Sequence, residues 1–395
     1  MHILKSLIEK ARAGECIRAA GLMSGTSADG VDAAIVDIEQ TAVRLVAFNT
    51  YPYPADLRKE VLSLCHNEKT DAEGVCHCNF VMGHVFADAV LQLCRDSSIS
   101  PDSLDLIGSH GQTIYHNPSG KRYADTQVAS TLQIGEPSVI AEHTKATVIA
   151  DFRCRDVAAG GEGAPLVPYT DYFLFHHGTL SRAIQNIGGI ANVTFLPAGC
   201  TEDDVVAFDT GPGNMVIDAL IESTTNGRST YDRNGALAAR GNVHAGILEE
   251  MLPHPFIAKQ PPKSTGREHF GKAFVDGIRR TAQVNNVSPA DLVATATAFT
   301  AAAIAMSYRK FLPALPNELL LCGGGAHNKT LVHMLNEQLE GVRITTTDEF
   351  GISSDAKEAV SFAILALATL KGLTGNVPAA TGADRKVVLG KIVPA

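Results

Sequence analysis

The sequence predicts an α/β chain built from two similar lobes. A strand, a glycine-rich turn and a second strand occupy residues 17–38, and the same arrangement returns at 182–196. After each pair come one further strand, several helical patterns and a buried strand that ends in a polar or glycine cluster. The two halves share this order although their identity is poor. Because two similar lobes leave a cleft between them, we expect the ligand site there.

The elements of the first half begin with an amphipathic helical pattern over the first 20 residues, which lacks the apolar core of a signal peptide. An antiparallel meander follows, and then helices alternate with buried strands. Strands are expected at 17–23, 33–38, 43–50, 104–113, 131–134 and 147–150, and helices at 55–64 and 75–96.

The second half repeats this order. Strands are expected within 182–196, at 205–209 and at the start of 318–328, and helices at 214–222, 237–252, 269–284 and 289–311. The longest uncharged runs are 292–308, which is rich in Ala and Thr, and 359–370, which is too short for a bilayer. We therefore expect no membrane partner.

Length and composition also limit the function. A chain of 395 residues with 45% hydrophobic and 19% charged residues is typical of a folded protein with two domains. The 33 basic and 42 acidic residues give a formal net charge of −9, and no basic stripe is visible, so we expect no nucleic-acid partner. An anionic ligand remains compatible with this charge, because backbone N–H groups bind phosphate without Lys or Arg.

The eight cysteines are scattered, except for Cys76 and Cys78 on either side of His77. This spacing is not that of a zinc site, and a chain of this size does not need a disulfide framework. We therefore expect reduced cysteines and a cytoplasmic protein.

The stretch "GLMSGTSADGVDAAIVDI" (21–38) interrupts two apolar strands with small and polar residues. Glycine permits close approach of a ligand, and successive N–H groups in such a turn can bind an anion. Asp29 and Asp32 are candidate ligands of Mg²⁺, directly or through water. The alternative is a stable hairpin turn, in which Asp and Ser act only as turn formers.

Three further loops have a similar composition: "NIGGIAN" (186–192), "FDTGPGN" (208–214) and "CGGGAHN" (322–328). The last offers backbone rather than side chains, which suits a flat ligand. The alternative is close packing of helices on strands. Neither a P-loop nor a strand–GxGxxG–helix unit is present, so those two nucleotide-binding motifs are excluded.

Seven segments together resemble the anhydro-N-acetylmuramic acid kinase family, a branch of the superfamily of actin, sugar kinases and heat-shock chaperone ATPases. They span residues 21–328, and "AKEAVSFAILA" (356–366) follows them. The segments are "GLMSGTSADGVDAAIVD", "GSHGQTIYH", "DFRCRDVAAGGEGAPLVP", "QNIGGIANVTFL", "FDTGPGN", "DRNGALAARG" and "LCGGGAHN".

This resemblance implies a two-lobed actin-like ATPase fold of the ribonuclease H type, with a central mixed sheet in each lobe and an interlobe cleft. The first lobe would comprise 1–145 and about 351–395, and the second 146–350. The resemblance also implies a homodimer that uses ATP and Mg²⁺. Its reaction opens the anhydro bridge of 1,6-anhydro-N-acetylmuramic acid with water and phosphorylates O6, giving N-acetylmuramate 6-phosphate and ADP in peptidoglycan recycling.

The family's ATP-binding segment matches residues 25–32, and its catalytic aspartate matches Asp209. As a general base, Asp209 needs only to be ionised at neutral pH. The alternative role for Asp209 is to cap a helix or form a turn. The expected nucleotide contacts are Gly25, Thr26, Ser27, Ala28, Asp29, Gly30, Val31, Asp32, Gly188, Gly189, Gly323, Gly324 and Gly325.

Arg153 is the expected partner of the substrate's lactyl carboxylate, and the end of strand 104–113 is expected to bind sugar hydroxyls or the acetamido group. The alternatives are a core histidine at position 110, a loop salt bridge between Arg153 and Asp156, and a helix-start role for Glu358. The full set of expected substrate contacts is His110, Gln112, Thr113, Arg153, Asp156, Asn192 and Glu358.

Two positions depart from the family pattern. Ala28 stands where a larger apolar residue such as Leu is expected, and this change should affect packing only. Glu162 stands where Gln is expected and adds a potential charge near the presumed cleft, so the resemblance does not decide whether residue 162 contacts the sugar.

Three other functions compete with this one. A different sugar kinase of the same superfamily would phosphorylate unbridged sugars. A nucleotide-switched binding or filament protein would bind partners without a small-molecule phosphate acceptor. A glycoside hydrolase with paired carboxylates such as Asp209 and Asp29 would act without ATP.

Overall fold

The computed structural model describes residues 2–25, 27–66 and 71–395, and the chain divides into two compact units. Unit 1 is Met1–Leu174 with Gly351–Ala395, and unit 2 is Phe175–Phe350. The first boundary therefore lies near 174 rather than at the predicted 145. The reason is that β6 (Thr147–Ala150) adds to the unit 1 sheet as a parallel neighbour of β4 (Leu106–Tyr123).

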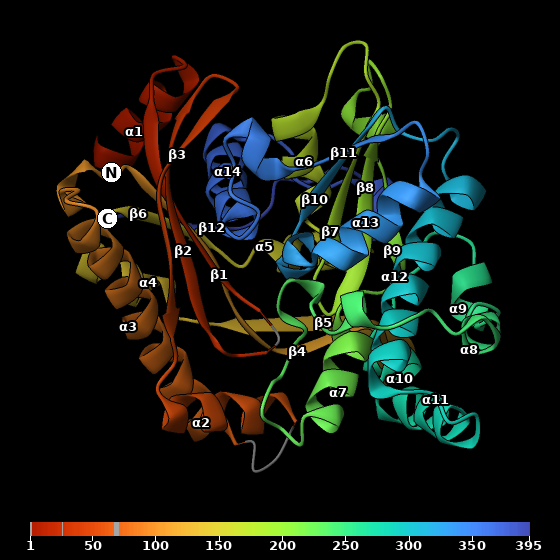
Figure 1. Ribbon diagram of the computed structural model, residues 1–395. Helices are drawn as coiled ribbons and strands as arrows, with labels where there is room; N and C mark the ends of the chain where they lie inside the picture. Colours follow the sequence, from red (N-terminus) through yellow and green to blue (C-terminus); the bar gives the residue numbers. More distant parts are fainter. Residues whose placement is uncertain (1, 26, 67–70) are drawn as a thin grey trace. The chain divides into compact units, whose positions relative to one another are not determined.

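Unit 1 is built on a seven-stranded sheet in the order β12–β6–β4–β1–β2–β3, with β5 paired to β4. The strands β1, β2 and β3 form the predicted antiparallel meander, visible side by side in Figure 1. The remaining strand bounds are β1 (Ile17–Ser24), β2 (Gly30–Glu39), β3 (Ala42–Pro52), β5 (Thr126–Ile134) and β12 (Lys391–Val393).

The helices of unit 1 begin and end where local signals place them. Asp71 caps α3 by accepting from the Gly74 N–H at 2.7 Å, and α14 ends at Gly372 with a left-handed backbone. The helices are α1 (His2–Arg12), α2 (Ala55–Cys65), α3 (Ala72–Asp96), α4 (Pro137–Thr144), α5 (Phe152–Ala158), α6 (Val167–Phe175), α14 (Lys357–Lys371) and α15 (Pro378–Thr381), with a 3₁₀ turn η1 (Pro101–Ser103).

Helix α14 packs directly on the sheet of unit 1 because two strand residues lack side chains. A Cβ at Gly21 of β1 would lie 1.8 Å from the Ala359 carbonyl oxygen, and one at Gly108 of β4 would lie 2.0 Å from the Phe362 carbonyl oxygen. Only glycine permits this approach of helix to strand. The approach fixes the N-terminal end of α14, and with it Glu358, relative to β1 and β4.

Unit 2 has a five-stranded sheet in the order β11–β10–β7–β8–β9. The strands β11, β10 and β7 are parallel, and β7, β8 and β9 are antiparallel neighbours, so each unit contains a mixed α/β sheet and the predicted fold class is confirmed. The strands are β7 (Arg182–Ile187), β8 (Ile190–Leu196), β9 (Val206–Pro212), β10 (Glu318–Cys322) and β11 (Arg343–Thr346).

The helices of unit 2 include α12, which Ser288 caps through its hydroxyl at 3.1 Å from the Asp291 nitrogen. They are α7 (Met215–Thr224), α8 (Ala245–Met251), α9 (Pro255–Ala258), α10 (Arg267–Phe270), α11 (Lys272–Val284), α12 (Pro289–Phe311) and α13 (Lys329–Gln338). The 3₁₀ turns are η2 (Glu202–Asp204), η3 (Arg233–Gly235), η4 (Ala238–Arg240), η5 (Gly324–His327) and η6 (Thr347–Phe350).

Several sequence predictions of elements are wrong in extent: the N-terminal helix ends at Arg12, the helix expected at 269–284 is broken at Gly271, and the strand expected at 131–134 begins at Thr126. Two further cases have a clear physical cause. The helix expected at 237–252 is interrupted, because a Cβ at Gly241 would lie 2.1 Å from the Ala290 carbonyl oxygen and His244 caps a new helix by accepting from the Ile247 N–H. The strand expected to end at residue 113 continues to Tyr123, because its outer half pairs with β5.

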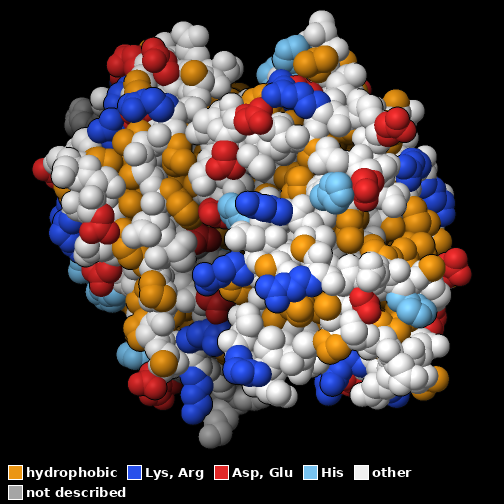
Figure 2. All heavy atoms as spheres, viewed as in Figure 1, with side chains coloured by type: hydrophobic (Ala, Val, Ile, Leu, Met, Phe, Trp, Pro, Cys, Tyr) orange, Lys and Arg blue, Asp and Glu red, His pale blue; other side chains and the backbone are white. Residues whose placement is uncertain are grey.

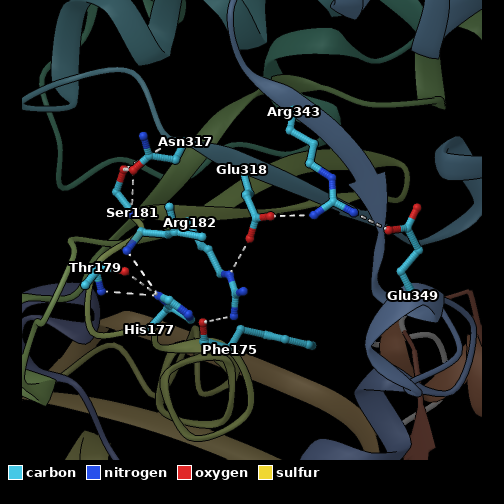
Figure 3. Close-up of polar contacts among 10 residues, drawn as sticks. Phe175, His177, Thr179, Ser181, Arg182, Asn317, Glu318, Arg343 and Glu349 are labelled. Atoms are coloured by element: carbon cyan, nitrogen blue, oxygen red, sulfur yellow. Dashed lines mark hydrogen bonds and ion pairs between the residues drawn. The ribbon is translucent and has the colours of Figure 1, made fainter.

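Buried charges join the beginning and the end of unit 2 (Figure 3). Arg182 donates to Glu318 at 2.8 Å and to the Phe175 carbonyl oxygen at 3.0 Å, and Glu318 also pairs with Arg343 at 2.6 Å. Arg343 reaches Glu349 at 2.7 Å. Burial raises the pKa of Glu318, but the two arginines outweigh it and the net pKa is lowered.

Two described helices, α3 and α12, are long and apolar enough to cross a membrane by length and composition alone. In α12, 78% of the most apolar window is buried inside the structure, as expected for a core helix. On the face in Figure 2, acidic and basic side chains are interspersed with scattered hydrophobic ones.

Candidate active site

Buried side chains hold the turn between β1 and β2 in unit 1. The Tyr53 hydroxyl donates to Ser24 Oγ at 2.7 Å, and Ser24 Oγ lies 2.7 Å from Gln112 Oε1. Gln112 Nε2 donates to the Gly25 carbonyl oxygen at 3.2 Å, and the Tyr53 N–H donates to the Asp29 carbonyl oxygen at 3.0 Å. Gln112, predicted to bind sugar, is therefore fully buried and supports the turn instead.

The glycines predicted to contact nucleotide are of two kinds. Gly30, Gly323 and Gly325 are required by packing, since a Cβ at each would lie 2.3–2.4 Å from a neighbouring atom. The others have room for a side chain, since a Cβ there would have no neighbouring atom closer than 3.7 Å, and are Gly25, Gly188, Gly189 and Gly324. Tight packing thus explains the first group, whereas a ligand approaching the backbone would explain the second.

The other residues of the turn differ in exposure. Ala28 is fully buried with φ of 49°, and its N–H donates to the Gly25 carbonyl oxygen at 3.2 Å, so this side chain packs inside unit 1. Val31 is also buried, whereas Ser27 is exposed. Thr26 lies outside the described residues.

His110, in the first half of β4, and Arg153 of α5 form a coupled pair. His110 Nδ1 lies 2.8 Å from the Gly111 carbonyl oxygen, and Arg153 Nε donates to His110 Nε2 at 3.0 Å, which assigns the proton to Nδ1. Burial, reinforced by the Arg153 charge, lowers the pKa of His110 to about 3, so the ring is neutral. Burial also lowers the pKa of Arg153, to about 10. Arg153 is therefore a cation that His110 holds in one position, as a binding site for a carboxylate requires.

Two carboxylates of unit 1, Asp32 and Glu358, interact electrostatically, and Glu358 also interacts with Arg153. Burial raises the pKa of Asp32, and the charge of Asp355 adds to this effect, although Thr50 Oγ1 donates to Asp32 at 2.6 Å. Burial also raises the pKa of Glu358; the charges of Lys357 and Arg153 oppose this effect, whereas those of Asp32 and Asp171 add to it. The structure therefore brings together Asp32, Arg153 and Glu358, which lie far apart in the sequence. The negative charges of Asp32 and Asp355 repel each other, and a cation bound at Asp32 would relieve this repulsion.

The predicted metal ligands differ in their fit to Mg²⁺. Asp32 is partly buried beside other carboxylates and suits a cation held directly or through water. Asp29 is largely exposed and pairs with Arg58 at 2.7 Å, so a competing cation already neutralises it. Among the residues the structure describes, no group of three His, Cys, Asp or Glu side chains is arranged to hold a metal ion.

Asp156 occupies a structural position rather than a ligand-facing one. Its side chain is fully buried, and one carboxylate oxygen accepts from the Gly163 N–H at 2.8 Å. The other accepts from Asn376 at 2.7 Å and from Thr381 at 2.9 Å. The carboxylate thus joins the 156–163 segment to the C-terminal part of unit 1, and the predicted substrate contact is corrected to a supporting role. Glu162, in the same segment, is exposed.

A cavity of about 610 Å³ opens in unit 1 beside His110 in the first half of β4 and beside the end of β6. Gln133 lines it, and its Oε1 is buried without a hydrogen-bond partner, while its Nε2 donates to Thr113 Oγ1 at 3.2 Å. Asn79 also lines it. A cavity of this size accommodates a small ligand, and an unpaired acceptor in its wall suits a hydroxyl or amide donor. The sequence prediction missed Gln133 and Asn79.

Loops of unit 2 converge at the end of β7. The N–H groups of Gly213 and Met215 donate to the Gly189 carbonyl oxygen at 2.9 and 3.2 Å, and the Asn214 N–H donates to the Gly188 carbonyl oxygen at 2.8 Å. Gly323, with φ of 75°, packs against the backbone and side chain of the β7 end. The three glycine-rich loops of unit 2, predicted separately, therefore form one surface next to the N-terminus of α7.

Asp209 lies at an irregular point of β9. It pairs with Asn192 across the sheet where the register between β8 and β9 shifts, so two of the predicted residues face each other. The Thr265 N–H donates to Asp209 Oδ2 at 2.8 Å, and the Asp209 N–H donates to the Lys263 carbonyl oxygen at 3.1 Å. Asp209 does not cap α7, because the N-cap of that helix is Asn214.

A family model described as anhydro-N-acetylmuramic acid kinase matches residues 17–395. The chain belongs to this family. A curated relative of that name from Caldanaerobacter subterraneus subsp. tengcongensis is 50% identical over 380 residues, which cover 94% of this chain and 96% of the relative. Another from Clostridioides difficile is 45% identical, with coverage of 95% and 97%.

Among solved structures, the activator of 2-hydroxyisocaproyl-CoA dehydratase from Clostridium difficile with bound ADPNP matches with a TM-score of 0.46 and 13% identity. The match covers 90% of this chain and 96% of the activator. Similarity at this level says nothing about activity. The family assignment therefore rests on the sequence relatives.

Proposed function

We propose that this chain is an ATP-dependent kinase that opens the bridge of 1,6-anhydro-N-acetylmuramic acid and phosphorylates O6. Membership of the anhydro-N-acetylmuramic acid kinase family carries this proposal. The products are N-acetylmuramate 6-phosphate and ADP, so the enzyme acts in the recycling of cell-wall sugar.

The reaction needs a base, a site for triphosphate and a cation for the sugar's carboxylate. Water attacks C1 and transfers its proton to the Asp209 carboxylate, while the C1–O6 bond breaks. O6 forms a bond to the γ-phosphorus as the bond to the β-phosphate oxygen breaks. The Thr265 N–H bonded to Asp209 Oδ2 at 2.8 Å holds the carboxylate in one orientation, which general base catalysis requires.

The unpacked glycines support the nucleotide part of this proposal. Gly25, Gly188, Gly189 and Gly324 leave room above their backbone, and phosphates bind such exposed main chain. Mg²⁺, when bound, neutralises charge on the transferring phosphoryl group, and Asp32 is the residue that we propose holds it.

Sugar recognition is proposed for the His110–Arg153 pair and for Glu358. Arg153 carries the positive charge that a lactyl carboxylate needs, and neutral His110 orients it through the 3.0 Å hydrogen bond. Thr113 and Asn192 are proposed to contact sugar hydroxyls or the acetamido group.

We make two further proposals, one from the family resemblance and one from the cysteines. We propose a homodimer, which light scattering of the purified chain would detect as twice the mass of one chain, 41.7 kDa. We also propose a cytoplasmic location, since all eight cysteines are free thiols and such cysteines are typical of a reducing compartment.

Mass spectrometry of the reaction in ¹⁸O-water tests the proposed chemistry. We expect one ¹⁸O at C1 and the phosphate on unlabelled O6. Product without ¹⁸O would contradict the proposal. Product formed only from unbridged sugars would indicate another sugar kinase instead, and bridge opening without ATP would indicate a glycoside hydrolase.

The Asp209→Asn variant tests the base. We expect turnover to fall by at least ~10², because the amide cannot accept the proton, while nucleotide affinity persists. The control is Asp203→Asn, an exposed aspartate of η2. Near-normal turnover of Asp209→Asn would remove Asp209 from the base role.

A further inference from the structure

The segment from Lys263 to Thr265 has a buried lysine that no step above uses. Lys263 is 5% exposed, and its ammonium lies 4.5 Å from the ring centroid of Phe311, 4.8 Å from that of Phe256 and 5.7 Å from that of Phe208. It also donates to the Phe256 carbonyl oxygen at 3.4 Å. Three aromatic faces thus enclose a cation inside unit 2, an arrangement that partly compensates its desolvation.

The main chain of the same segment contacts Asp209 on two sides. The Lys263 carbonyl oxygen accepts from the Asp209 N–H at 3.1 Å, and the Thr265 N–H donates to Asp209 Oδ2 at 2.8 Å. The orientation of the carboxylate therefore depends on where this segment lies. The lysine side chain, inserted among aromatic residues of α9, β9 and α12, fixes that position.

The charge of Lys263 also acts on Asp209. Burial and the charges of Lys310 on α12 and Lys259 after α9 together lower the pKa of Lys263 to about 8, against the opposing effect of Asp209 on β9. Among the described charges that influence Lys263, Asp209 is thus the one opposite in sign. An apolar side chain would fill the aromatic box at less desolvation cost, so packing alone does not explain a lysine here.

We propose that Lys263 is a positioning residue for the Asp209 carboxylate. Its side chain anchors the 263–265 segment so that the Thr265 N–H holds one carboxylate oxygen, and its ammonium favours the ionised carboxylate. This inference rests on the proposed function for the meaning of Asp209, but the electrostatic coupling between the two residues can be measured without any reaction.

An NMR titration of ¹³C-lysine-labelled protein tests the coupling directly. In the wild-type chain we expect one lysine side chain to titrate near pH 8. Asp209→Asn removes the negative charge, and the same lysine should then titrate at lower pH. A lysine whose titration is the same in both proteins would overturn the proposal, whatever reaction the chain catalyses.

Kinetics test the consequence for turnover. In Lys263→Met we expect kcat to fall about tenfold or more, with KM for ATP unchanged within about twofold, and the acidic limb of the kcat–pH profile to move to higher pH. Lys263→Arg, which keeps its charge at all working pH values, should recover part of kcat and retain it above pH 8. Lys272→Met on α11 is the control, since this lysine is exposed and is not among the charges that influence Lys263, and it should leave kcat and its pH profile unchanged.

The outcomes separate this inference from the proposed function. Equal losses in Lys263→Met and Lys263→Arg with an unshifted pH profile would overturn the inference, because packing alone would then account for the residue. Product formation by the wild-type chain would at the same time support the proposed function. If Lys263→Met does not fold, the wild-type kcat should still decline above about pH 8 as Lys263 loses its proton, and a flat alkaline profile would overturn the inference.

Discussion

The β1–β2 hairpin of unit 1 and the β7–β8 hairpin of unit 2 occupy the same position in two sheets of matching topology. In unit 1 the order β6–β4–β1–β2–β3 places three parallel strands before two antiparallel ones. In unit 2 the order β11–β10–β7–β8–β9 does the same. The order of these strands along the chain also agrees, so the internal repeat predicted from the sequence extends to strand pairing.

The two hairpin turns are stabilised differently. Side chains support the turn of unit 1, since Ser24, Tyr53 and Gln112 form a buried hydrogen-bonded group around it. Main chain supports the turn of unit 2, since Gly188 and Gly189 accept from the N–H groups of the 213–215 loop. A turn that leaves its backbone open to a ligand can therefore be held by either means, and each predicts a different sensitivity to substitution.

The largest effect is expected in unit 2 from Gly213→Ala. A Cβ there would lie 2.3 Å from the Gly188 carbonyl oxygen, so the two loops must separate. We expect a loss of about 3 kcal/mol in the free energy of unfolding together with loss of nucleotide binding, because the contact is with rigid backbone. Thermal unfolding and nucleotide titration measure the two effects.

The control for Gly213→Ala is Gly277→Ala on α11, where a Cβ would meet nothing within 4 Å. Helix propensity predicts a gain of roughly 0.5–1 kcal/mol for this variant. An unchanged unfolding temperature for Gly213→Ala would show that main-chain contacts do not hold the unit 2 turn.

A smaller effect is expected in unit 1 from Gln112→Leu. The change leaves the Gly25 carbonyl and the buried Ser24 hydroxyl with one partner fewer, at a cost of about 2 kcal/mol in the free energy of unfolding. Chemical denaturation measures this cost, with the exposed Gln283→Leu on α11 as the control. If both variants lose the same stability, side-chain support of the turn is refuted.

The smallest effect on stability is expected from Gly25→Ala, because a Cβ there would meet nothing within 4 Å. We expect the free energy of unfolding to stay within ~0.5 kcal/mol of the wild-type value. The KM for ATP should nevertheless rise about tenfold, since the methyl group occupies space that we propose for phosphate. Steady-state kinetics measure the KM for ATP. The control is Gly178→Ala, since a Cβ at this glycine would also meet nothing within 4 Å. An unchanged KM would exclude Gly25 from the nucleotide site.

Local patterns in the sequence were enough to predict most elements. The strand at 147–150 and the helix at 289–311 agree with β6 and α12 at both ends, because alternation, capping and proline act within a few residues. The interrupted helix at 237–252 could not be predicted in the same way. It breaks where Gly241 meets the Ala290 backbone, a contact between segments far apart in the chain.

In the candidate site, too, some features follow from the sequence and others from contacts between distant segments. The sequence by itself determined the family and the glycine-rich loops. It also identified four candidate functional residues, which are Asp209, His110, Arg153 and Glu358. Only the tertiary structure decided that Gln112 and Asp156 are buried supports and that the unpredicted Gln133 and Asn79 line a cavity beside His110. The physical reason is that burial, hydrogen-bond partners and electrostatic coupling depend on distances between segments, and composition and spacing along one chain do not contain those distances.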